Sequence, residues 1–292
     1  MSADEVGVDP AAALAWAEEV IGPVATVRAL SGGWTSAMLS LASRDGRRAV
    51  LRLMTHDPWR RHGAELTTRE CETQTMLAAT PVPAPLSLAL DADGERCGVP
   101  AHLMTHLPGR LETSHADPAS LAELAGLLAT VHEVVPATPP RDYQSWAGAA
   151  KWRIPPWSDD AGLWTAAFDV LDSEPPAADW CFLHRDFQPR NVLWHQGRVS
   201  GLVDWVETSR GPAWIDVAHC ATSIAIVHGL EAGEEFSRLY RARTDAEVLP
   251  WYEVMDVVGF LPLPGGRDWF TEGGPEHGLL EQRLRRTMTT LG

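Results

Sequence analysis

The stretch Phe182–Trp194, FLHRDFQPRNVLW, places a run of polar side chains between two short apolar segments. Asp186 and Asn191 are five residues apart in it, and a second acid, Asp204, follows in VSGLVDW. The apolar flanks predict two short strands, NVLW and GLVDW, joined by a turn at HQGR. Such a hairpin would bring Asn191 and Asp204 to the same end of the pair, beside the loop that carries Asp186.

These three side chains suit the transfer of a phosphoryl group. Amide and carboxylate oxygens are the hard ligands that Mg²⁺ prefers, with phosphate oxygens and water completing its octahedron. Asn191 and Asp204 could therefore hold the metal, which leaves Asp186 to accept the proton of an attacking hydroxyl. The alternative is that Asp186 and Asn191 only stabilise turns, as these residue types often do. That alternative does not explain why all three polar groups lie beside apolar strands, so we favour the catalytic interpretation.

Composition and charge exclude several function classes. The chain has 292 residues, enough for one large core or two smaller ones, and a formal net charge of −15. Such an acidic surface argues against nucleic acid or an anionic membrane as the main partner and is compatible with a cationic substrate. No apolar run approaches the roughly 20 residues that span a bilayer, and the first residues lack a secretory pattern, so we expect a cytoplasmic protein. The cysteines are far apart and predict neither a disulfide framework nor a zinc site.

Periodicity and turn signals predict a strand-rich part followed by a mainly helical part, and hence an α+β fold. The strand-rich part is predicted to contain two helices, at residues 10–20 and 64–78, and a three-stranded antiparallel meander, at residues 24–30, 36–42 and 48–54. Two further strands are predicted on either side of a turn at residues 91–94. The helical part is predicted to contain helices at residues 118–134, 160–172, 213–229, 231–242 and 277–291.

The motifs HRDFQPRNVLW, GLVDW and GPAWIDVAH resemble those of the aminoglycoside phosphotransferase family, small-molecule kinases with a protein-kinase-like fold. LSGGW, RRAVLRLM, RECETQTML and HLMTHLPG match the order of that family as well, so the resemblance extends from about Leu30 to about His228. It implies two lobes: residues 1–104, a nucleotide-binding lobe with a five-stranded antiparallel sheet and a helix, and residues 105–292, a larger, mainly helical lobe for catalysis and acceptor binding. It also implies Mg²⁺ as cofactor and ATP or GTP as phosphoryl donor.

The same resemblance implies a role for each residue of the polar cluster. Asp186 is similar to the family's catalytic base, and Asn191 and Asp204 resemble its Mg²⁺ ligands. Asp216 looks like the acid that braces the catalytic loop from the following helix, with an N-terminal helix cap as the alternative. His184 is assigned to the same structural support.

Arg185 departs from the family pattern, because most members have glycine at this position. Protein kinases have arginine there, where it binds an activation-loop phosphate. Only eleven residues separate Asp204 from Asp216, too few for such a loop, and no A-P-E motif follows. We therefore reject a protein kinase and interpret Arg185 as structural or substrate-facing.

The phosphate-binding cation is the second departure. Lys151 is the only lysine of the chain, so the third strand cannot supply the usual lysine. Arg52 in VLRLM is the candidate to meet the α- and β-phosphates, with Glu70 on the next helix as its partner. A solvated Arg52, and Glu72 in place of Glu70, are the alternatives.

Two further segments are assigned to the nucleotide. Ser31, Gly32 and Gly33 would form a turn that covers the phosphates, since glycines allow close backbone approach; a plain hairpin turn would have the same sequence. Thr105 and Leu107, in LMTHLPG, would meet a purine edge through the carbonyl of Thr105 and the amide of Leu107.

The acceptor must be a small molecule with a hydroxyl group. Carboxylates and aromatic rings of the helical part suit a cationic one, and Asp256, Glu253, Trp214 and Trp251 are the candidates; a solvated helix face with core tryptophans is the alternative. We favour a kinase that phosphorylates an antibiotic and so confers resistance. A metabolic kinase for a sugar, an amino alcohol or a nucleoside is the second hypothesis, and a non-catalytic nucleotide-binding pseudokinase is the third. The sequence leaves open the acceptor, the choice of ATP or GTP, and the oligomeric state.

Overall fold

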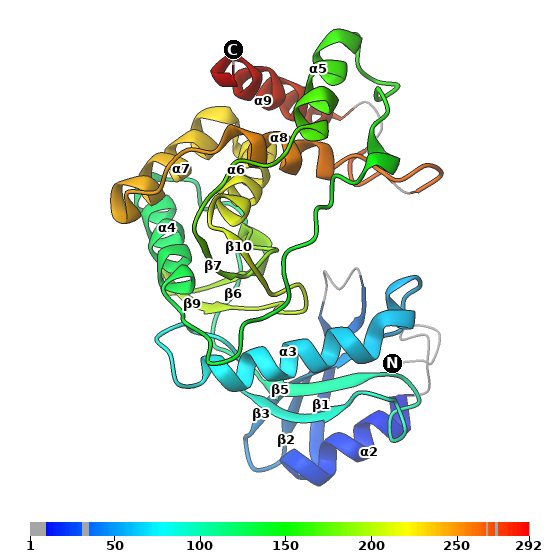
Figure 1. Ribbon diagram of the computed structural model, residues 1–292. Coiled ribbons are helices and arrows are strands. Elements are labelled where there is room, and N and C mark those ends of the chain that lie inside the picture. The colour runs from blue at the N-terminus through cyan, green and yellow to red at the C-terminus, as the bar shows by residue number, and fades with distance from the viewer. Residues whose placement is uncertain (1–9, 31–34, 267, 272–273, 292) are drawn as a thin grey trace. The chain divides into compact units, whose positions relative to one another are not determined.

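The computed structural model describes residues 10–30, 35–266, 268–271 and 274–291 (Figure 1). The chain divides into two compact units. One, the sheet unit, consists of Met1–Gly109 and Ser200–Glu207, and the other, the helical unit, consists of Arg110–Val199 and Thr208–Gly292. The sequence suggested a single cut between residues 104 and 105. The structure instead returns Ser200–Glu207 to the first unit, because Trp205 and Val206 pack and hydrogen-bond with residues of that unit.

The sheet unit is built on an antiparallel sheet with the strand order β1-β2-β3-β5-β4. Its strands are β1 (Val24–Leu30), β2 (Ala37–Ser43), β3 (Arg48–Leu53), β4 (Ser87–Asp91) and β5 (Ala101–Thr105). Two helices, α2 (Pro10–Ile21) and α3 (Gly63–Leu77), cover opposite faces of this sheet (Figure 1). The five-stranded antiparallel sheet predicted from the sequence is therefore confirmed.

Strand alternation decides which side chains each helix covers. Leu51 and Leu53 of β3 and Leu103 of β5 are buried in one core with α2. Successive side chains of a strand point to opposite faces. Arg52 and His102, which are next to these leucines in sequence, therefore face the α3 side. Arg52 and His102 are directly paired across β3 and β5. The sequence thus places two polar side chains together beneath α3.

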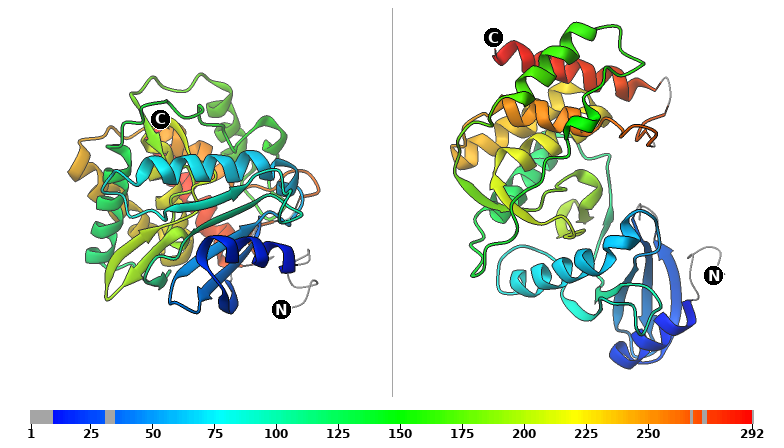
Figure 2. Two further views of the ribbon diagram at one scale, coloured as in Figure 1. Left: turned by 90° about the horizontal axis from the view of Figure 1, so that it is seen from below. Right: turned by 45° about the vertical axis from the view of Figure 1, so that its right-hand side comes forward.

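The helical unit is arranged around α6 (Trp214–His228), which contacts α7 (Leu230–Thr244), α8 (Pro250–Gly259) and α9 (Pro275–Leu291) (Figure 2). The unit also contains α4 (Pro118–His132) and α5 (Ala161–Asp172). Most residues of α6 are buried, which fits its nearly uninterrupted apolar sequence. Within the described ranges, no helix combines the length and the apolar character needed to cross a membrane.

Helix α8 is absent from the sequence-based expectations. Pro250 starts it, as proline often does at a first helical position. Three of its ten residues are valines, which have low intrinsic helix propensity. Val254, Val257 and Val258 are fully buried, so packing against α6 and α9 stabilises this helix.

Short strands flank the polar loop, which we define as residues 184–191. β7 (Trp180–Leu183) leads into it and pairs with β10 (Ser209–Pro212). β8 (Val192–His195) follows it and pairs with β9 (Arg198–Leu202), and β6 (Arg110–Leu111) pairs with β8 on its other side. The turn between β8 and β9 has positive φ at both Gln196 and Gly197, as a tight two-residue hairpin turn requires. The hairpin predicted from NVLW and GLVDW is present.

Helices α6 and α7 approach each other closely at Gly233. A Cβ atom added there would lie 2.4 Å from the carbonyl oxygen of Ala221. The Gly233→Ala variant should therefore be less stable by about 1–3 kcal/mol, the usual cost of overpacking a core. Gly278→Ala, at an exposed position of α9 with no atom within 4 Å, is the matched control and should be neutral or up to about 1 kcal/mol more stable. Urea unfolding monitored by circular dichroism measures both, and equal midpoints would contradict the close approach.

Candidate functional site

The polar loop is held by one buried carboxylate. The backbone amides of His184 and Arg185 each donate a hydrogen bond of 2.8 Å to Asp216, one to each carboxylate oxygen. Nε2 of His132 lies 3.3 Å from the same group. Burial raises the pKa of Asp216, but the hydrogen bond and charge of His132 lower the pKa by a larger amount, so the net pKa is below its usual value. The cap of α6 is Ala213 and not Asp216; Asp216 instead bonds to the loop amides.

Arg185 adopts a backbone conformation that usually requires glycine. Its φ is +75°, in the left-handed region where a Cβ is unfavourable. Its side chain is buried, with the guanidinium 3.9 Å from the ring centre of Trp146 and with Nη2 donating to the carbonyl of Gln144 at 3.0 Å. The cation–π contact and hydrogen bond offset part of the strain. This geometry explains why glycine suits the position, and it gives Arg185 structural contacts within the helical unit.

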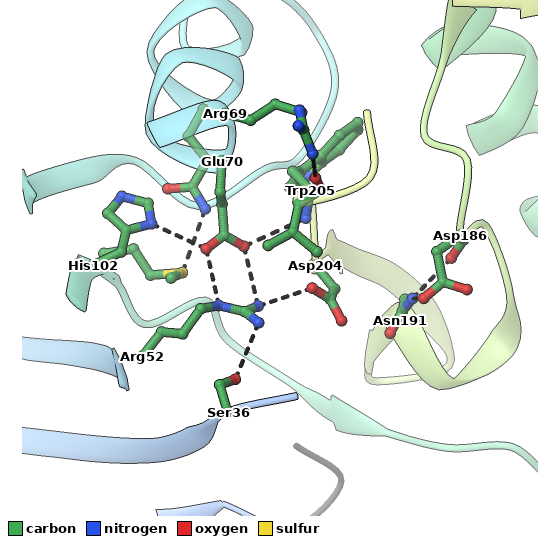
Figure 3. Close-up of polar contacts among 12 residues, drawn as sticks. Ser36, Arg52, Arg69, Glu70, His102, Asp186, Asn191, Asp204 and Trp205 are labelled. Atoms are coloured by element: carbon green, nitrogen blue, oxygen red, sulfur yellow. Dashed lines mark hydrogen bonds and ion pairs between the residues drawn. The ribbon is translucent and has the colours of Figure 1, made fainter. Parts of the chain in front are cut away.

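The carboxylate of Asp186 accepts hydrogen bonds at both oxygens. Oδ1 accepts from Nε2 of Gln188 at 2.7 Å and lies 3.0 Å from Nε2 of His219. Oδ2 accepts from Nδ2 of Asn191 at 2.8 Å (Figure 3). Its side chain is 23% exposed. Burial raises the pKa of Asp186, but the hydrogen bond and positive charge of His219 lower it more, so the net pKa lies below the usual value. Asp186 is therefore an ionised acceptor at neutral pH.

Asn191 is oriented by the same loop. It ends a short 3₁₀ turn, Pro189–Asn191. Nδ2 donates to the backbone carbonyl of Asp186 as well as to its carboxylate, both at 2.8 Å. Since both side-chain hydrogen bonds use the amide nitrogen, the amide oxygen is the atom with which Asn191 could bind a hard cation.

A second polar cluster lies between β3, β5 and α3 in the sheet unit. Arg52 Nη2 donates to Glu70 Oε1 at 3.1 Å and to Asp204 Oδ1 at 2.9 Å, Nε lies 3.0 Å from Glu70 Oε2, and Nη1 donates to Ser36 at 3.2 Å (Figure 3). Arg52 is 4% exposed. It is therefore not a solvated strand residue, and its partner is Glu70, whereas Glu72 is exposed.

Glu70 is the centre of this cluster. His102 Nδ1 lies 3.0 Å from Oε2, and the backbone amide of Trp205 donates to Oε1 at 3.4 Å. Burial raises the pKa of Glu70, but the charge of Arg52 and the hydrogen bond of His102 outweigh it and lower the pKa to about 2. Nε2 of His102 is 2.9 Å from the hydroxyl of Ser87. Both nitrogens of His102 thus have a partner within the unit.

Asp204 lies two residues beyond β9, in the sheet unit. Its φ is +69°, a left-handed conformation that aspartate tolerates better than most residues. Arg69 of α3 donates to the carbonyl of Val206 at 2.5 Å, and Trp205 bonds to Glu70 as described. The segment that carries Asp204 is therefore attached to α3.

Other predicted nucleotide contacts are only partly described. Ser31, Gly32 and Gly33 lie outside the described residues. Thr105 ends β5, and its amide donates to the carbonyl of Leu86 at 2.9 Å; Leu107 follows two residues later. The roles of these residues stay predictions.

The residues assigned to the acceptor are engaged inside the helical unit. Trp214 is buried and donates to Glu253 at 3.1 Å, and Thr287 donates to the other oxygen of Glu253 at 2.9 Å. Trp251 donates to the carbonyl of Val170 at 2.9 Å. Asp256, also buried, lies beside His219, with its Oδ1 2.9 Å from Nδ1 of the imidazole. These contacts weigh against direct acceptor binding by Trp214 and Glu253, and the assignment stays a prediction.

Sequence reasoning missed His219. It lies in GPAWIDVAH, three residues after Asp216. Side chains three apart share one face of a helix, so a helix that presents Asp216 to the polar loop presents His219 nearby. That spacing was the available signal. No group of three His, Cys, Asp or Glu side chains within the described ranges could hold a metal ion.

The model of the phosphotransferase enzyme family matches residues 26–252 of this chain. The protein belongs to the phosphotransferase enzyme family. A curated relative, the aminoglycoside 3′-phosphotransferase of Enterococcus faecalis, is 32% identical over 90 residues, which are 30% of this chain and 34% of the relative. The match therefore spans about a third of that relative's length.

Solved structures of phosphotransferases share the fold. A protein of Ralstonia eutropha described as an aminoglycoside phosphotransferase has a TM-score of 0.67 at 18% identity, with 96% of this chain and 98% of that chain covered. A thermostable mutant of aminoglycoside phosphotransferase APH(4)-Ia, in ternary complex with ADP and hygromycin B, has a TM-score of 0.65 at 19% identity, with 94% and 97% covered. The resemblance in sequence and the kinase-like fold that it implied are confirmed.

The ion pair of Glu70 should make the stability of this family member depend on pH in a defined window. Glu70→Gln leaves the Arg52 charge buried without its main partner, so we expect a loss of about 3–5 kcal/mol at pH 7. The folded-state pKa is lowered from 4.5 to about 2, so this stabilisation is complete above the unfolded-state pKa and is lost as pH falls towards the folded-state pKa.

Urea unfolding of wild type and Glu70→Gln between pH 7 and pH 3 tests this expectation. The difference between their free energies of unfolding should stay constant down to about pH 5 and shrink below it. Glu72→Gln, an exposed site on the same helix, is the matched control and should cost less than about 0.5 kcal/mol throughout. A difference that does not vary with pH would show that Glu70 has the same pKa in the folded and unfolded states, and would contradict the stabilising buried ion pair.

Proposed function

We propose that this protein is a Mg²⁺-dependent phosphotransferase that moves the γ-phosphoryl group of a nucleoside triphosphate to a hydroxyl group of a small molecule, favoured here as an antibiotic. The observation that carries this proposal is the carboxylate of Asp186. It is ionised, partly exposed and fixed by side-chain contacts on both oxygens, in a loop whose backbone is itself held by Asp216. Membership of the phosphotransferase enzyme family supports the reaction type.

The hydrogen bonds of Asp186 favour Oδ2 as the atom that meets the acceptor hydroxyl. Oδ1 has contacts with Gln188 and His219, whereas Oδ2 accepts, among the described residues, from Asn191 alone. A carboxylate oxygen can accept two hydrogen bonds, so Oδ2 has capacity for one more. The low pKa of Asp186 suits this role, because in a loose transition state the proton leaves late and orientation matters more than basicity.

The residues of the family motif fit a magnesium ion by their donor chemistry. Asn191 of the helical unit has its amide nitrogen engaged and its oxygen as the remaining donor, and Asp204 of the sheet unit supplies a partly exposed carboxylate. These are the oxygen ligands that Mg²⁺ takes beside phosphates and water. When bound, the ion would neutralise charge on the transferred phosphate. Arg52, oriented by Glu70, would supply the cation for the α- and β-phosphates.

The donor and the acceptor are assigned by analogy with relatives. The solved APH(4)-Ia complex contains ADP and hygromycin B, which supports a nucleotide donor, ATP or GTP, and an aminoglycoside-like acceptor. A metabolic kinase for a sugar, an amino alcohol or a nucleoside is the second candidate, because the carboxylates of α8 have partners within the helical unit and do not single out a cationic acceptor. A panel of hydroxylated antibiotics and metabolites, incubated with Mg²⁺ and each nucleotide and analysed by mass spectrometry, decides between them.

The role of Asp186 as proton acceptor can be tested by substitution. Asp186→Asn should lower phosphoryl transfer to the acceptor found in this panel by about 10²–10⁴-fold, the range for losing a positioned proton acceptor. Nucleotide binding, measured by calorimetry with AMP-PNP, should persist. Asp172→Asn, an exposed position at the end of α5, should leave turnover unchanged. Turnover of Asp186→Asn near the wild-type level would rule out the proposed mechanism.

The role of Asp204 as a metal ligand can be tested in the same way. Asp204→Asn should remove the gain in AMP-PNP affinity that Mg²⁺ gives to the wild type, because a carboxylate ligand is replaced by a neutral amide. Calorimetric titrations with and without Mg²⁺ measure this gain directly, and a tenfold change corresponds to about 1.4 kcal/mol. Asp57→Asn, at an exposed site of the same unit, is the control. An unchanged Mg²⁺ dependence would show that Asp204 does not bind the metal.

A further inference from the structure

His219 lies between two aspartates in the helical unit. Its Nε2 is 3.0 Å from Oδ1 of Asp186 in the polar loop, and its Nδ1 is 2.9 Å from Oδ1 of Asp256 in α8. The ring is stacked on Phe260, with ring centres 5.7 Å apart, and makes a T-shaped contact with Trp146, with ring centres 5.3 Å apart. His219 is 5% exposed. The imidazole is therefore held in one orientation by two carboxylates and two aromatic rings.

The number of protons determines the charge of this group. An ionised carboxylate only accepts hydrogen bonds, and a neutral imidazole has one N–H donor and one lone pair. A neutral ring between two ionised carboxylates would therefore direct its lone pair at an oxygen anion. Burial lowers the pKa of His219, but the charge of Asp256 and the hydrogen bond of Asp186 raise it to about 9. At neutral pH the ring is an imidazolium that donates to both carboxylates.

Two further basic groups among the described residues act on the two aspartates beside His219. Lys151 donates from Nζ to the carbonyl of Gly259 at 2.5 Å, at the end of α8, and interacts electrostatically with Asp256. Burial lowers the pKa of Lys151 to about 8. His184 acts on Asp186 from within the polar loop. Within the described part of the chain, the ion pair of the Asp186 carboxylate is with His219.

We propose that His219 is a positioning residue for phosphoryl transfer: it fixes Oδ1 of Asp186, so that Oδ2 faces the acceptor hydroxyl, and Asp256 is its counter-ion. This inference rests on the proposed function. As the acceptor oxygen bonds to the γ-phosphorus, the bond from phosphorus to the nucleoside diphosphate breaks and the hydroxyl proton passes to Oδ2 of Asp186. His219 keeps its own proton throughout. Asp256, which the sequence suggested as an acceptor contact, then acts through His219.

An NMR titration of the full chain with ¹³C-labelled histidine and aspartate tests the proposal without an acceptor. In the wild type, one imidazole should stay protonated up to about pH 9 and be absent from the spectrum of His219→Gln. Asp256→Asn should lower its pKa by about one unit or more, because a neighbouring anion is lost. His219→Gln should raise the pKa of the Asp186 carboxyl by a similar amount, because a neighbouring cation is lost. Asp186→Asn identifies that carboxyl signal.

His277→Gln is the matched control. His277 is buried in the same unit, and its Nε2 lies 3.1 Å from Oδ2 of Asp268, far from the polar loop in sequence. This variant should move neither pKa. With the acceptor from the panel, His219→Gln should also lower kcat about tenfold, leave the KM for nucleotide unchanged, and move the acidic limb of the kcat/KM profile to higher pH.

The possible outcomes are distinct. A neutral His219 at pH 7, or an Asp186 pKa that is the same in His219→Gln and wild type, overturns the inference. Asp256→Asn keeps the size of the side chain, so it provides the charge test even where His219→Gln fails to fold. Failure of the proposed function would be seen separately, as phosphoryl transfer that survives Asp186→Asn.

Discussion

A buried carboxylate needs a hydrogen-bond donor for each of its oxygens, and in this protein that requirement shapes the polar loop. Asp216 is fully buried, and ionised carboxylates are costly to bury without donors. The amides of His184 and Arg185 are two of these donors. Both amides can point at one carboxylate only if the chain turns sharply, and the left-handed φ of Arg185 is that turn. The direction in which the chain continues to Asp186 follows from this constraint.

The sheet unit satisfies the same requirement with a different set of donors. Glu70 is fully buried and is surrounded by Arg52, His102 and the amide of Trp205. These donors come from two strands and from a segment that joins the unit from beyond residue 199. Each unit thus carries a carboxylate at its polar centre, and in each the carboxylate ties a distant segment of chain to a helix. The proposed ligands Asn191 and Asp204 are attached to these two networks.

Local patterns were sufficient to predict much of this arrangement. Alternating apolar residues predicted the strands of the sheet, and the apolar segments NVLW and GLVDW with the turn at HQGR predicted the hairpin that follows the polar loop. Helix α8 was missed because its valines disfavour an isolated helix and only packing stabilises it. His219 was missed for a related reason: a single histidine in an apolar helix is typical of a core, and its partners are 33 and 37 residues away in sequence. Asp256 is buried beside His219, which its residue type does not indicate, and its role in acceptor binding stays a prediction.

The choice of arginine over lysine at position 52 has a physical reason in the same network. An ammonium group offers three donors around one nitrogen, whereas a guanidinium offers five in one plane. Arg52 uses that plane to meet both oxygens of Glu70, one oxygen of Asp204 and the hydroxyl of Ser36. A lysine could not hold Glu70 from two sides while also reaching Asp204. Arg52 therefore links Ser36, Glu70 of α3 and the Asp204 segment to β3, and the planar geometry of its guanidinium serves these contacts as well as its charge.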